Sequence, residues 1–213
     1  MTKIEAREIT GGLSKTSKMP GYSYSIHPSS CGTGSLLRGI PGSVCHNCYA
    51  QKGRYCFKGP QNAMHRRLKS IEHPLWVEAM VSLIDSQDCR WFRWHDAGDV
   101  QGWFHLDKIF EVSRRLPEYK FFLPTKEYSL VRDYVRSHQV PANLVIRVGA
   151  PMIDQVFPKE IEDPVKSSMV CTKDKLPGDV WVCPATADPQ RKTCGSCRAC
   201  WATSCPCVAY VKH

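Results

Sequence analysis

The chain has 213 residues, enough for one well-buried α/β domain and a small appendage. No apolar stretch approaches the roughly 20 residues of a bilayer-spanning helix, and the first residues lack the apolar core of a signal peptide. We therefore expect a cytosolic protein that does not associate with membranes. The formal net charge of +9 favours acidic partners, and nucleic acid is the first candidate.

Along the chain, helical and strand patterns alternate. Residues 1–20 are polar and basic and contain glycine and proline breakers, so we expect a surface arm there. Alternation of apolar and polar residues predicts a first strand over residues 22–26. The further predicted helices are residues 61–70, 74–86, 100–116 and 127–138, and the further predicted strands are residues 90–95, 120–123, 143–148, 179–182 and 208–211.

Strands that alternate with helices of this length indicate right-handed βαβ units and a mostly parallel sheet. On the helix over residues 100–116, we expect Trp103 to lie on the buried side with the other apolar residues. Four prolines within residues 149–178 predict an irregular insertion. The α/β domain would then cover residues 21–178, and a Cys-rich segment over residues 179–213 would pack on it.

The cysteine usage indicates metal or redox chemistry, because the cytosol keeps thiols reduced and the chain has twelve of them. Cys31, Cys45 and Cys48 form a first group within a loop over residues 31–56 that is rich in glycine and proline. We expect this loop to form neither helix nor strand, so that its backbone N–H groups are free to bind sulfide or an anion. Three thiolates leave an iron–sulfur cluster one ligand short, so either one iron stays open or Cys56 completes the set.

A second group consists of Cys183 and three cysteines at successive two-residue gaps, Cys194, Cys197 and Cys200. This spacing resembles a ferredoxin run, whereas zinc ribbons usually present two separate cysteine pairs. We therefore predict an iron–sulfur cluster here, with zinc as the alternative. Cys183 and Cys205 both qualify as the fourth ligand, and we favour Cys183 because it follows a predicted strand directly.

Polar residues follow the predicted strands, at the edge where parallel sheets carry their functional sites. Taken strand by strand, they are His95, Gly98 and Asp99, then Thr125 and Lys126, then Arg147. The Asp99 carboxylate could hold a cationic group of a ligand, although an aspartate before a helix is also a common N-cap. His95 has an alternative interpretation as a core histidine, and Lys126 as a solvated residue in the first turn of a helix.

Together these features resemble the bacteriophage "gene product 88" family, which is similar in pattern to radical S-adenosylmethionine (SAM) enzymes of the spore photoproduct lyase type. The resemblance covers about residues 15–213. Its matching features are Cys31, Cys45-x2-Cys48-Tyr49-Ala50, Arg93-x-His95-x-x-Gly98-Asp99, Thr125-Lys126, Cys183-Pro184, Cys194-x2-Cys197-x2-Cys200 and a terminal His213.

The resemblance implies a partial (β/α) barrel with a 4Fe–4S cluster on Cys31, Cys45 and Cys48 and an auxiliary cluster on the C-terminal cysteines. It also implies that SAM chelates the open iron and is cleaved to a 5′-deoxyadenosyl radical, for which a protein reductant would supply the electron. Gly98-Asp99 lies where these enzymes bind the SAM amino group. The implied site residues are Tyr49, Gly98, Asp99, Thr125 and Arg147 for the cofactor and His95, Asp99 and Lys126 for catalysis.

We favour a radical SAM-like enzyme in the cytoplasm, which is that of the infected host cell if the chain is a phage protein. The competing hypothesis is a non-catalytic iron–sulfur or zinc protein that binds nucleic acid or a host partner. The number of ligands at the first site separates the two, because an open coordination position distinguishes a reactive metal site from a structural one.

Overall fold

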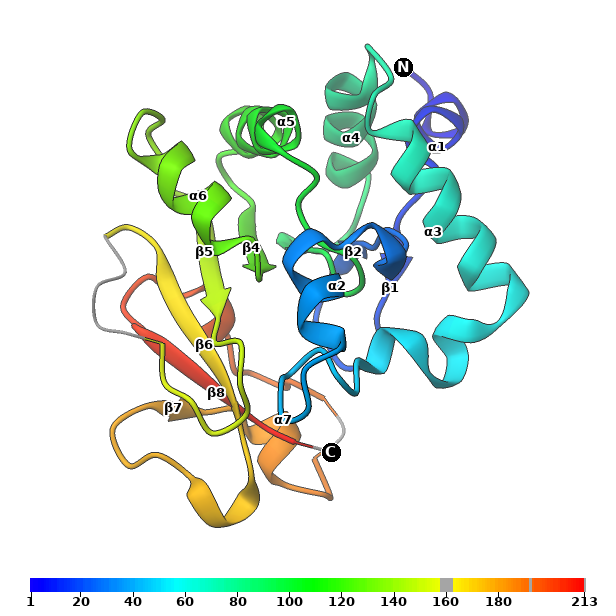
Figure 1. Cartoon of the computed structure of the whole chain (residues 1–213). Helices are drawn as coiled ribbons and strands as arrows, with labels where there is room; N and C mark the ends of the chain where they lie inside the picture. The colour runs from blue at the N-terminus through cyan, green and yellow to red at the C-terminus, as the bar shows by residue number, and fades with distance from the viewer. Residues whose placement is uncertain (158–162, 192, 213) are drawn as a thin grey trace.

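The computed structural model describes residues 1–157, 163–191 and 193–212. In these ranges the chain forms an open eight-stranded sheet with the order β1-β2-β3-β4-β5-β6-β8-β7 (Figure 1). Neighbouring strands are parallel except for β1 and β2, which pair antiparallel. The strands are β1 Ser14–Lys15, β2 Tyr22–Tyr24, β3 Trp91–Trp94, β4 Lys120–Thr125, β5 Leu144–Gly149, β6 Lys166–Cys171, β7 Trp181–Val182 and β8 Cys207–Val211.

The helices connect these strands, and α4, α5 and α6 cover one face of the sheet. They are α1 Lys3–Thr10, α2 Gly32–Arg38, α3 Lys58–Ser70, α4 Trp76–Asp85, α5 Trp103–Arg115, α6 Tyr128–Val135 and α7 Pro184–Ala187. Short 3₁₀ turns add η1 Pro28–Ser30, η2 Tyr49–Gln51, η3 Gly53–Cys56, η4 Lys173–Lys175 and η5 Ala199–Trp201. Strands β2 to β5 are neighbours in sequence and in space, so right-handed crossovers leave α4, α5 and α6 on the same face. No helix in the described ranges has the length and apolar character of a membrane-spanning segment.

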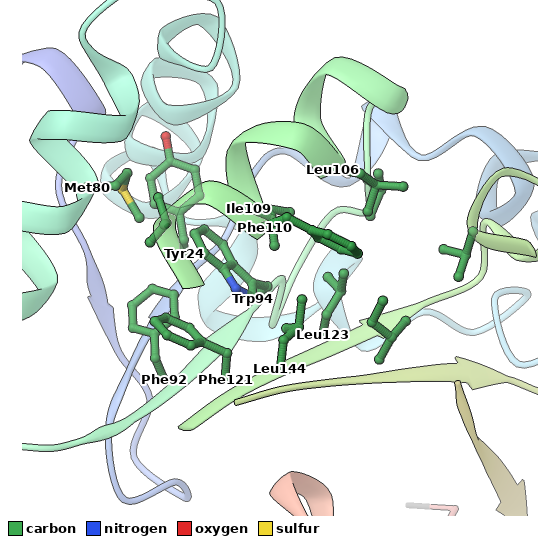
Figure 2. Packing of buried hydrophobic residues seen from close by; sticks show 14 of the residues in the cluster. Tyr24, Met80, Phe92, Trp94, Leu106, Ile109, Phe110, Phe121, Leu123 and Leu144 are labelled. Atoms are coloured by element: carbon green, nitrogen blue, oxygen red, sulfur yellow. The ribbon is translucent and has the colours of Figure 1, made fainter. Parts of the chain in front are cut away.

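The main hydrophobic core lies between that face and helices α4 to α6. Phe92 and Trp94 alternate with outward residues along β3 and meet edge to face at 5.0 Å (Figure 2). Tyr24 of β2 is fully buried, and its hydroxyl donates to the carbonyl of Thr10 at 2.8 Å. Burying side chains of this size stabilises the fold by about 1.5–3 kcal/mol each. The opposite face of the sheet is covered by the C-terminal segment, where Trp201 meets the ring of Trp91 at 5.6 Å.

The predicted α/β class and the mostly parallel sheet are confirmed, and each predicted strand overlaps an observed one. The irregular insertion expected over residues 149–178 is wrong in part, because β6 lies within it and pairs with β5 and β8. The sequence of β6, KSSMVC, is too polar to stand out as a buried strand, and its place in the sheet is set by its neighbours. Residues 158–162 of this stretch lie outside the described residues.

The expectation of an arm over residues 1–20 is wrong, because α1 forms there and packs against α4. A capping box closes its start: the Glu5 amide donates to Thr2 Oγ1 at 3.2 Å, and the Thr2 amide donates to Glu5 Oε2 at 2.7 Å. Ala6 is fully buried in a small cluster with Ala79 and Leu83 of α4. The helix docks through the small Ala6 with the partly buried Ile9 beside it, a pattern too sparse for hydrophobic periodicity to reveal.

Two local expectations also fail. The loop over residues 31–56 was expected to lack regular structure, yet α2 begins directly after Cys31. Its glycines do not prevent this helix because Glu127 and the sheet edge hold its first turn from outside. Trp103 was expected on the buried side of α5 but is 48% exposed. It stands at the first position of that helix, with its ring edge against Tyr134 at 5.5 Å.

The close approach of β2 and β3 leaves no room for a side chain at Gly21, directly before β2. A Cβ atom at Gly21 would lie 1.8 Å from the carbonyl oxygen of Trp91, which is backbone and cannot turn away. We expect Gly21→Ala to part the two strands, to cost more than about 4 kcal/mol and to leave the protein insoluble. Gly59→Ala is the control, because nothing lies within 4 Å of its Cβ position in α3, and it should be neutral or stabilising by up to about 1 kcal/mol. Equal yields of soluble protein from the two variants would contradict this packing.

Candidate functional site

The first cysteine group gathers around the N-terminal turn of α2. A Cβ atom at the buried Gly34 would lie 3.7 Å from the sulfurs of both Cys31 and Cys45, so the two thiols flank the same glycine. Cys48 follows in a tight turn, in which its amide donates to the carbonyl of Cys45 at 3.2 Å. The structure therefore brings the three predicted ligands together. Cys56 ends η3 with an exposed side chain, outside this group.

This group lies over the carboxyl ends of the parallel strands. The loop is attached to the end of β4 by Glu127, whose carboxylate accepts from the Thr33 amide and the Thr33 hydroxyl, both at 2.8 Å. It is attached to the end of β5 by the Val44 amide, which donates to the carbonyl of Pro151 at 2.9 Å. Glu127 was not predicted from the sequence, although it directly follows Thr125 and Lys126. Glu127 has its role at the site through its contact with Thr33, which is far away in the sequence.

Asp99 joins the ends of β3 and β4 beneath the cysteine group. Its Oδ1 accepts from the Thr125 hydroxyl at 2.6 Å and the Val100 amide at 2.8 Å, and its Oδ2 accepts from the Lys126 amide at 2.8 Å. Burial raises the pKa of Asp99 to about 6, although these hydrogen bonds act to lower it. Asp99 and Thr125 are thus together at the rim, and a carboxylate with four lone-pair sites retains one acceptor position on Oδ2.

Lys126 extends beside the first cysteine group. Its ammonium donates to the carbonyl of Ala150. Burial lowers the pKa of Lys126 to about 8, and the neighbouring Cys45 and Asp99 oppose that change. Gly98 has a packing role next to them, because a Cβ atom there would lie 2.3 Å from Cγ1 of Ile26. One carboxylate and one amine, those of Asp99 and Lys126, therefore lie beside the thiols of the first cysteine group.

Two of these thiols resist ionisation. Burial, reinforced by the nearby Asp99, Cys48 and Cys45, raises the pKa of Cys31 to about 12, and burial also raises the pKa of Cys45. All twelve cysteines are free of disulfides. In the described ranges, no three His, Cys, Asp or Glu side chains are arranged to hold one metal ion. An iron–sulfur cluster binds each thiolate through a different iron, so its ligands surround a space rather than converge on one point. The free thiols of Cys31 and Cys45 beside Gly34, with Cys48 in the turn after Cys45, fit that demand.

A polar network that the sequence did not predict connects the two cysteine groups. Tyr49, directly after Cys48, donates through its hydroxyl to the carbonyl of Asp96. Arg93 of β3 donates to that hydroxyl at 3.4 Å. Burial lowers the pKa of Arg93, but Tyr49, Asp96 and the thiol of Cys200 outweigh it and the pKa is raised overall. Arg93 therefore faces both cysteine groups. The pairing of β3 with its neighbouring strands sets this position.

His95 lies in the core, not at the cysteine group. It is 3% exposed and has a left-handed φ of 52°. Its ring faces His105 of α5 at 5.1 Å, and both of its nitrogens are without a hydrogen-bond partner among the described residues. Burial lowers the pKa of His95 to about 3. In the described ranges, no side-chain hydrogen bond therefore connects this predicted catalytic residue to Asp99 or Lys126.

The second cysteine group lies within the C-terminal segment that covers the sheet. Burial raises the pKa of Cys194 and that of Cys200, the latter to about 11, and Cys183 raises both further, so Cys183 lies near the two thiols. The amide of Cys197 donates to the carbonyl of Cys194 at 3.0 Å. Cys205 lies near one member of the group, Cys197, and its thiol donates to the carbonyl of Cys207 at 3.3 Å. Cys183 is near two members and Cys205 near one, which favours Cys183 as the fourth member.

Arg147 holds this segment on the sheet. It is fully buried, and its guanidinium donates to the carbonyls of Cys200 at 3.1 Å and Ser167 at 3.1 Å. The further acceptors are the carbonyls of Ala199 at 2.8 Å, Ala202 at 2.9 Å and Cys205 at 2.9 Å. Arg147 was predicted to contact a cofactor at the first site, and the structure directs it to the second cysteine group. The terminal His213 of the predicted pattern lies outside the described residues.

Comparison with known protein families matches residues 2–203 to the family described as gene product 88. No curated protein and no solved structure matches the chain. The match extends over both cysteine groups, the rim residues and Arg147. Apart from the terminal His213, the features used for the resemblance therefore fall within the matched residues.

Proposed function

The chain belongs to the gene product 88 family, and from the geometry of its cysteines we propose that it is an iron–sulfur protein with a radical SAM-like first site. Cys31, Cys45 and Cys48 would hold a 4Fe–4S cluster with one open iron. Cys183, Cys194, Cys197 and Cys200 would hold a second cluster. The observation that carries the proposal is the placement of three free thiols, without Cys56, beside Asp99 and Lys126 at the carboxyl edge of the sheet.

The topology supports the finer proposal of a partial barrel. In a doubly wound sheet the strand order reverses and the helices occupy both faces. Here the order from β2 to β6 follows the chain, and α4, α5 and α6 share one core on one face. This one-sided winding is the pattern of (β/α) barrels, whose sites lie at the carboxyl ends of the strands.

The residues around the first group have roles that follow from their contacts. A cluster with an open iron supplies one-electron chemistry to a ligand bound there, and a protein reductant would provide the electron. The remaining acceptor position of Asp99 Oδ2 suits a ligand amine. The Lys126 ammonium compensates thiolate charge next to Cys45. The hydrogen bonds of Glu127 to Thr33 hold Cys31, which precedes α2, in position.

The decisive experiment is metal and sulfide analysis of protein purified without oxygen. We expect a brown protein with a broad absorbance at about 400 nm from thiolate-ligated clusters. The analysis should find comparable amounts of iron and acid-labile sulfide. Stoichiometric zinc without sulfide would refute both clusters.

Reduction with dithionite in the presence of SAM then tests the open iron, and 5′-deoxyadenosine is the expected product. Asp99→Asn should weaken SAM binding while the cluster stays. Asparagine keeps an oxygen that accepts hydrogen bonds between the ends of β3 and β4, but it loses the negative charge of the carboxylate. Asp99→Ala should also weaken SAM binding, but it additionally removes three hydrogen bonds to the joint. Undiminished SAM binding by Asp99→Asn would remove Asp99 from the site.

One observation favours a second candidate, a non-catalytic iron–sulfur or zinc protein that binds nucleic acid or a host partner. Asp99 already accepts three hydrogen bonds, and the Lys126 ammonium already donates to Ala150. These contacts are what a purely structural joint between strand ends would have. A fully loaded cluster that does not bind SAM would select this candidate.

Serine substitutions test the ligand assignment residue by residue. Cys194→Ser, Cys197→Ser and Cys200→Ser should each give metal-poor or insoluble protein, because metal binding by distant segments contributes directly to folding. Cys89→Ser is the control, since its half-buried thiol lies against the backbone carbonyls of Pro20 at 3.3 Å and Trp91 at 3.9 Å. It should cost about 1–2 kcal/mol and retain full metal. Equal metal content in all four variants would contradict the assignment.

A further inference from the structure

The positive surplus of the protein lies in one continuous stretch. Residues 9–71 contain nine Lys or Arg and no Asp or Glu, and the rest of the chain contains 20 of each kind. The net charge of +9 is therefore that of residues 9–71 alone. Elsewhere, arginines form ion pairs such as Arg90 with Asp85 at 3.2 Å and Arg115 with Glu78 at 3.3 Å. Within the described residues, none of the nine cations in residues 9–71 forms an ion pair.

Three exposed cations of this stretch, Lys58, Arg66 and Lys69, lie along α3. One side of the helix is fixed in the protein by Arg67, whose guanidinium donates to the carbonyls of Gly12 at 2.8 Å and Ser25 at 3.2 Å. The exposed residues of the helix that recur at three- and four-residue spacing are Lys58, Asn62, His65, Arg66 and Lys69. At 1.5 Å per residue this stripe is about 17 Å long. Figure 1 shows α3 at the outer margin of the molecule, away from the sheet.

The N-terminal end of the stripe carries an exposed aromatic ring. Phe57 is the residue immediately before α3 and is 63% exposed. Lys52 and Arg54 are exposed just ahead of it. Arg66 faces a cleft shared with α1, where Arg7 adds a second guanidinium and Glu8 a carboxylate. We call Lys52, Arg54, Phe57, Lys58, Arg66 and Lys69 the α3 basic face.

We propose that the α3 basic face binds single-stranded nucleic acid, with its cations on successive phosphates and Phe57 stacked on a base. Unpaired Lys and Arg side chains neutralise phosphates, and an exposed aromatic ring offers a base a sequence-tolerant platform. An acidic protein partner fits less well. Protein interfaces have an apolar core and are depleted in lysine, whereas the positions between these cations are the polar Asn62 and His65. This binding does not depend on either cluster.

Fluorescence anisotropy with a labelled, mixed-sequence DNA strand measures the proposed binding across about 50–200 mM salt. The test variant carries Lys58→Gln, Arg66→Gln and Lys69→Gln. The control variant carries Lys120→Gln, Lys173→Gln and Lys212→Gln, which removes the same charge from exposed positions outside residues 9–71. Because the test variant neutralises three fewer phosphates, its slope of log Kd against log salt should fall by about 2, whereas the slope of the control should stay unchanged.

Phe57→Ala separates stacking from charge. It should weaken binding of the single strand on the order of tenfold and leave binding of a duplex nearly unchanged, because duplex bases are already stacked. Circular dichroism should show that all variants fold. Equal slopes for the two triple variants would overturn the proposal, and so would a wild-type protein that binds polyglutamate but no oligonucleotide.

Discussion

Replacing Arg147 with methionine should release the C-terminal cysteine segment from the sheet. Methionine fills much of the same volume but leaves five backbone carbonyls without their donor. Each buried acceptor that loses its partner costs about 1–3 kcal/mol unless it reaches water, and these can reach water only if the segment lifts off. We therefore expect a loss of more than about 3 kcal/mol in the free energy of unfolding.

Limited proteolysis with subtilisin measures this release. The variant should be cleaved within residues 183–207 while the remaining chain resists, and Trp201 should lose its buried position against Trp91 and Phe122. Its second cysteine group should also be poor in metal, because Arg147 holds the backbone of two of its neighbours and of Cys200 itself. Arg198→Met is the matched control, since that guanidinium donates hydrogen bonds within its own turn, to Gly195 at 2.6 Å and Cys197 at 2.8 Å, and meets the sheet through the face of the Trp91 ring at 5.2 Å, without a hydrogen bond to it. A protected segment in the Arg147→Met protein would contradict the anchoring role.

Arg147 also shows where reasoning from the sequence stops. Its position near the end of a strand was predictable, because the apolar run of β5 is typical of a strand buried on both faces. The segment that folds over it is more than 50 residues away in sequence, as the hydrogen bond to Cys200 shows. No local pattern indicates which backbone carbonyls will meet a given guanidinium.

The same difference between local patterns and long-range contacts explains which residues of the candidate site could be predicted. Asp99, Thr125 and Lys126 could be predicted as neighbours because the carboxyl ends of adjacent parallel strands meet at one edge. Arg93 could not, because alternation along a strand does not say which face will be the core until a partner covers the other. Helix α1 was missed for a different reason: its capping box between Thr2 and Glu5 is visible in the sequence, but hydrophobic periodicity is weak there.

Acid should destabilise the protein through His95 and His105. Both rings are buried, at 3% and 0% exposure, and between them three of four nitrogens lack a hydrogen-bond partner among the described residues. Burial lowers the pKa of His95 to about 3 and that of His105 well below its ordinary value. The folded protein thus keeps both rings neutral, whereas the unfolded chain binds protons below about pH 6.5.

Because the unfolded state binds more protons, the free energy of unfolding has its full value above about pH 6.5 and decreases as the pH falls. Each histidine that stays neutral contributes about 1.4 kcal/mol per pH unit, over a window that for His95 extends down to about pH 3. Asp99 acts in the opposite direction. Burial raises its pKa to about 6, so the folded state takes up its proton first and gains stability as the pH falls from about 6 towards 4. Because Asp99 and the histidines act in opposite directions, the contribution of one histidine to the pH dependence is measured as the difference between the wild-type protein and a variant that lacks that histidine.

Urea unfolding at several pH values between about 7 and 5 gives that difference. His105→Leu removes one of the two buried rings and should lower the pH dependence by about 1.4 kcal/mol per unit, after a constant offset for the missing hydrogen bond from the Gln101 amide at 3.3 Å. His73→Asn changes an exposed histidine and should leave the pH dependence as in the wild-type protein. If His105→Leu and His73→Asn follow the wild-type profile alike, His105 is protonated or solvated in the folded state. The core would then contain a polar site where the structure has two neutral rings in contact.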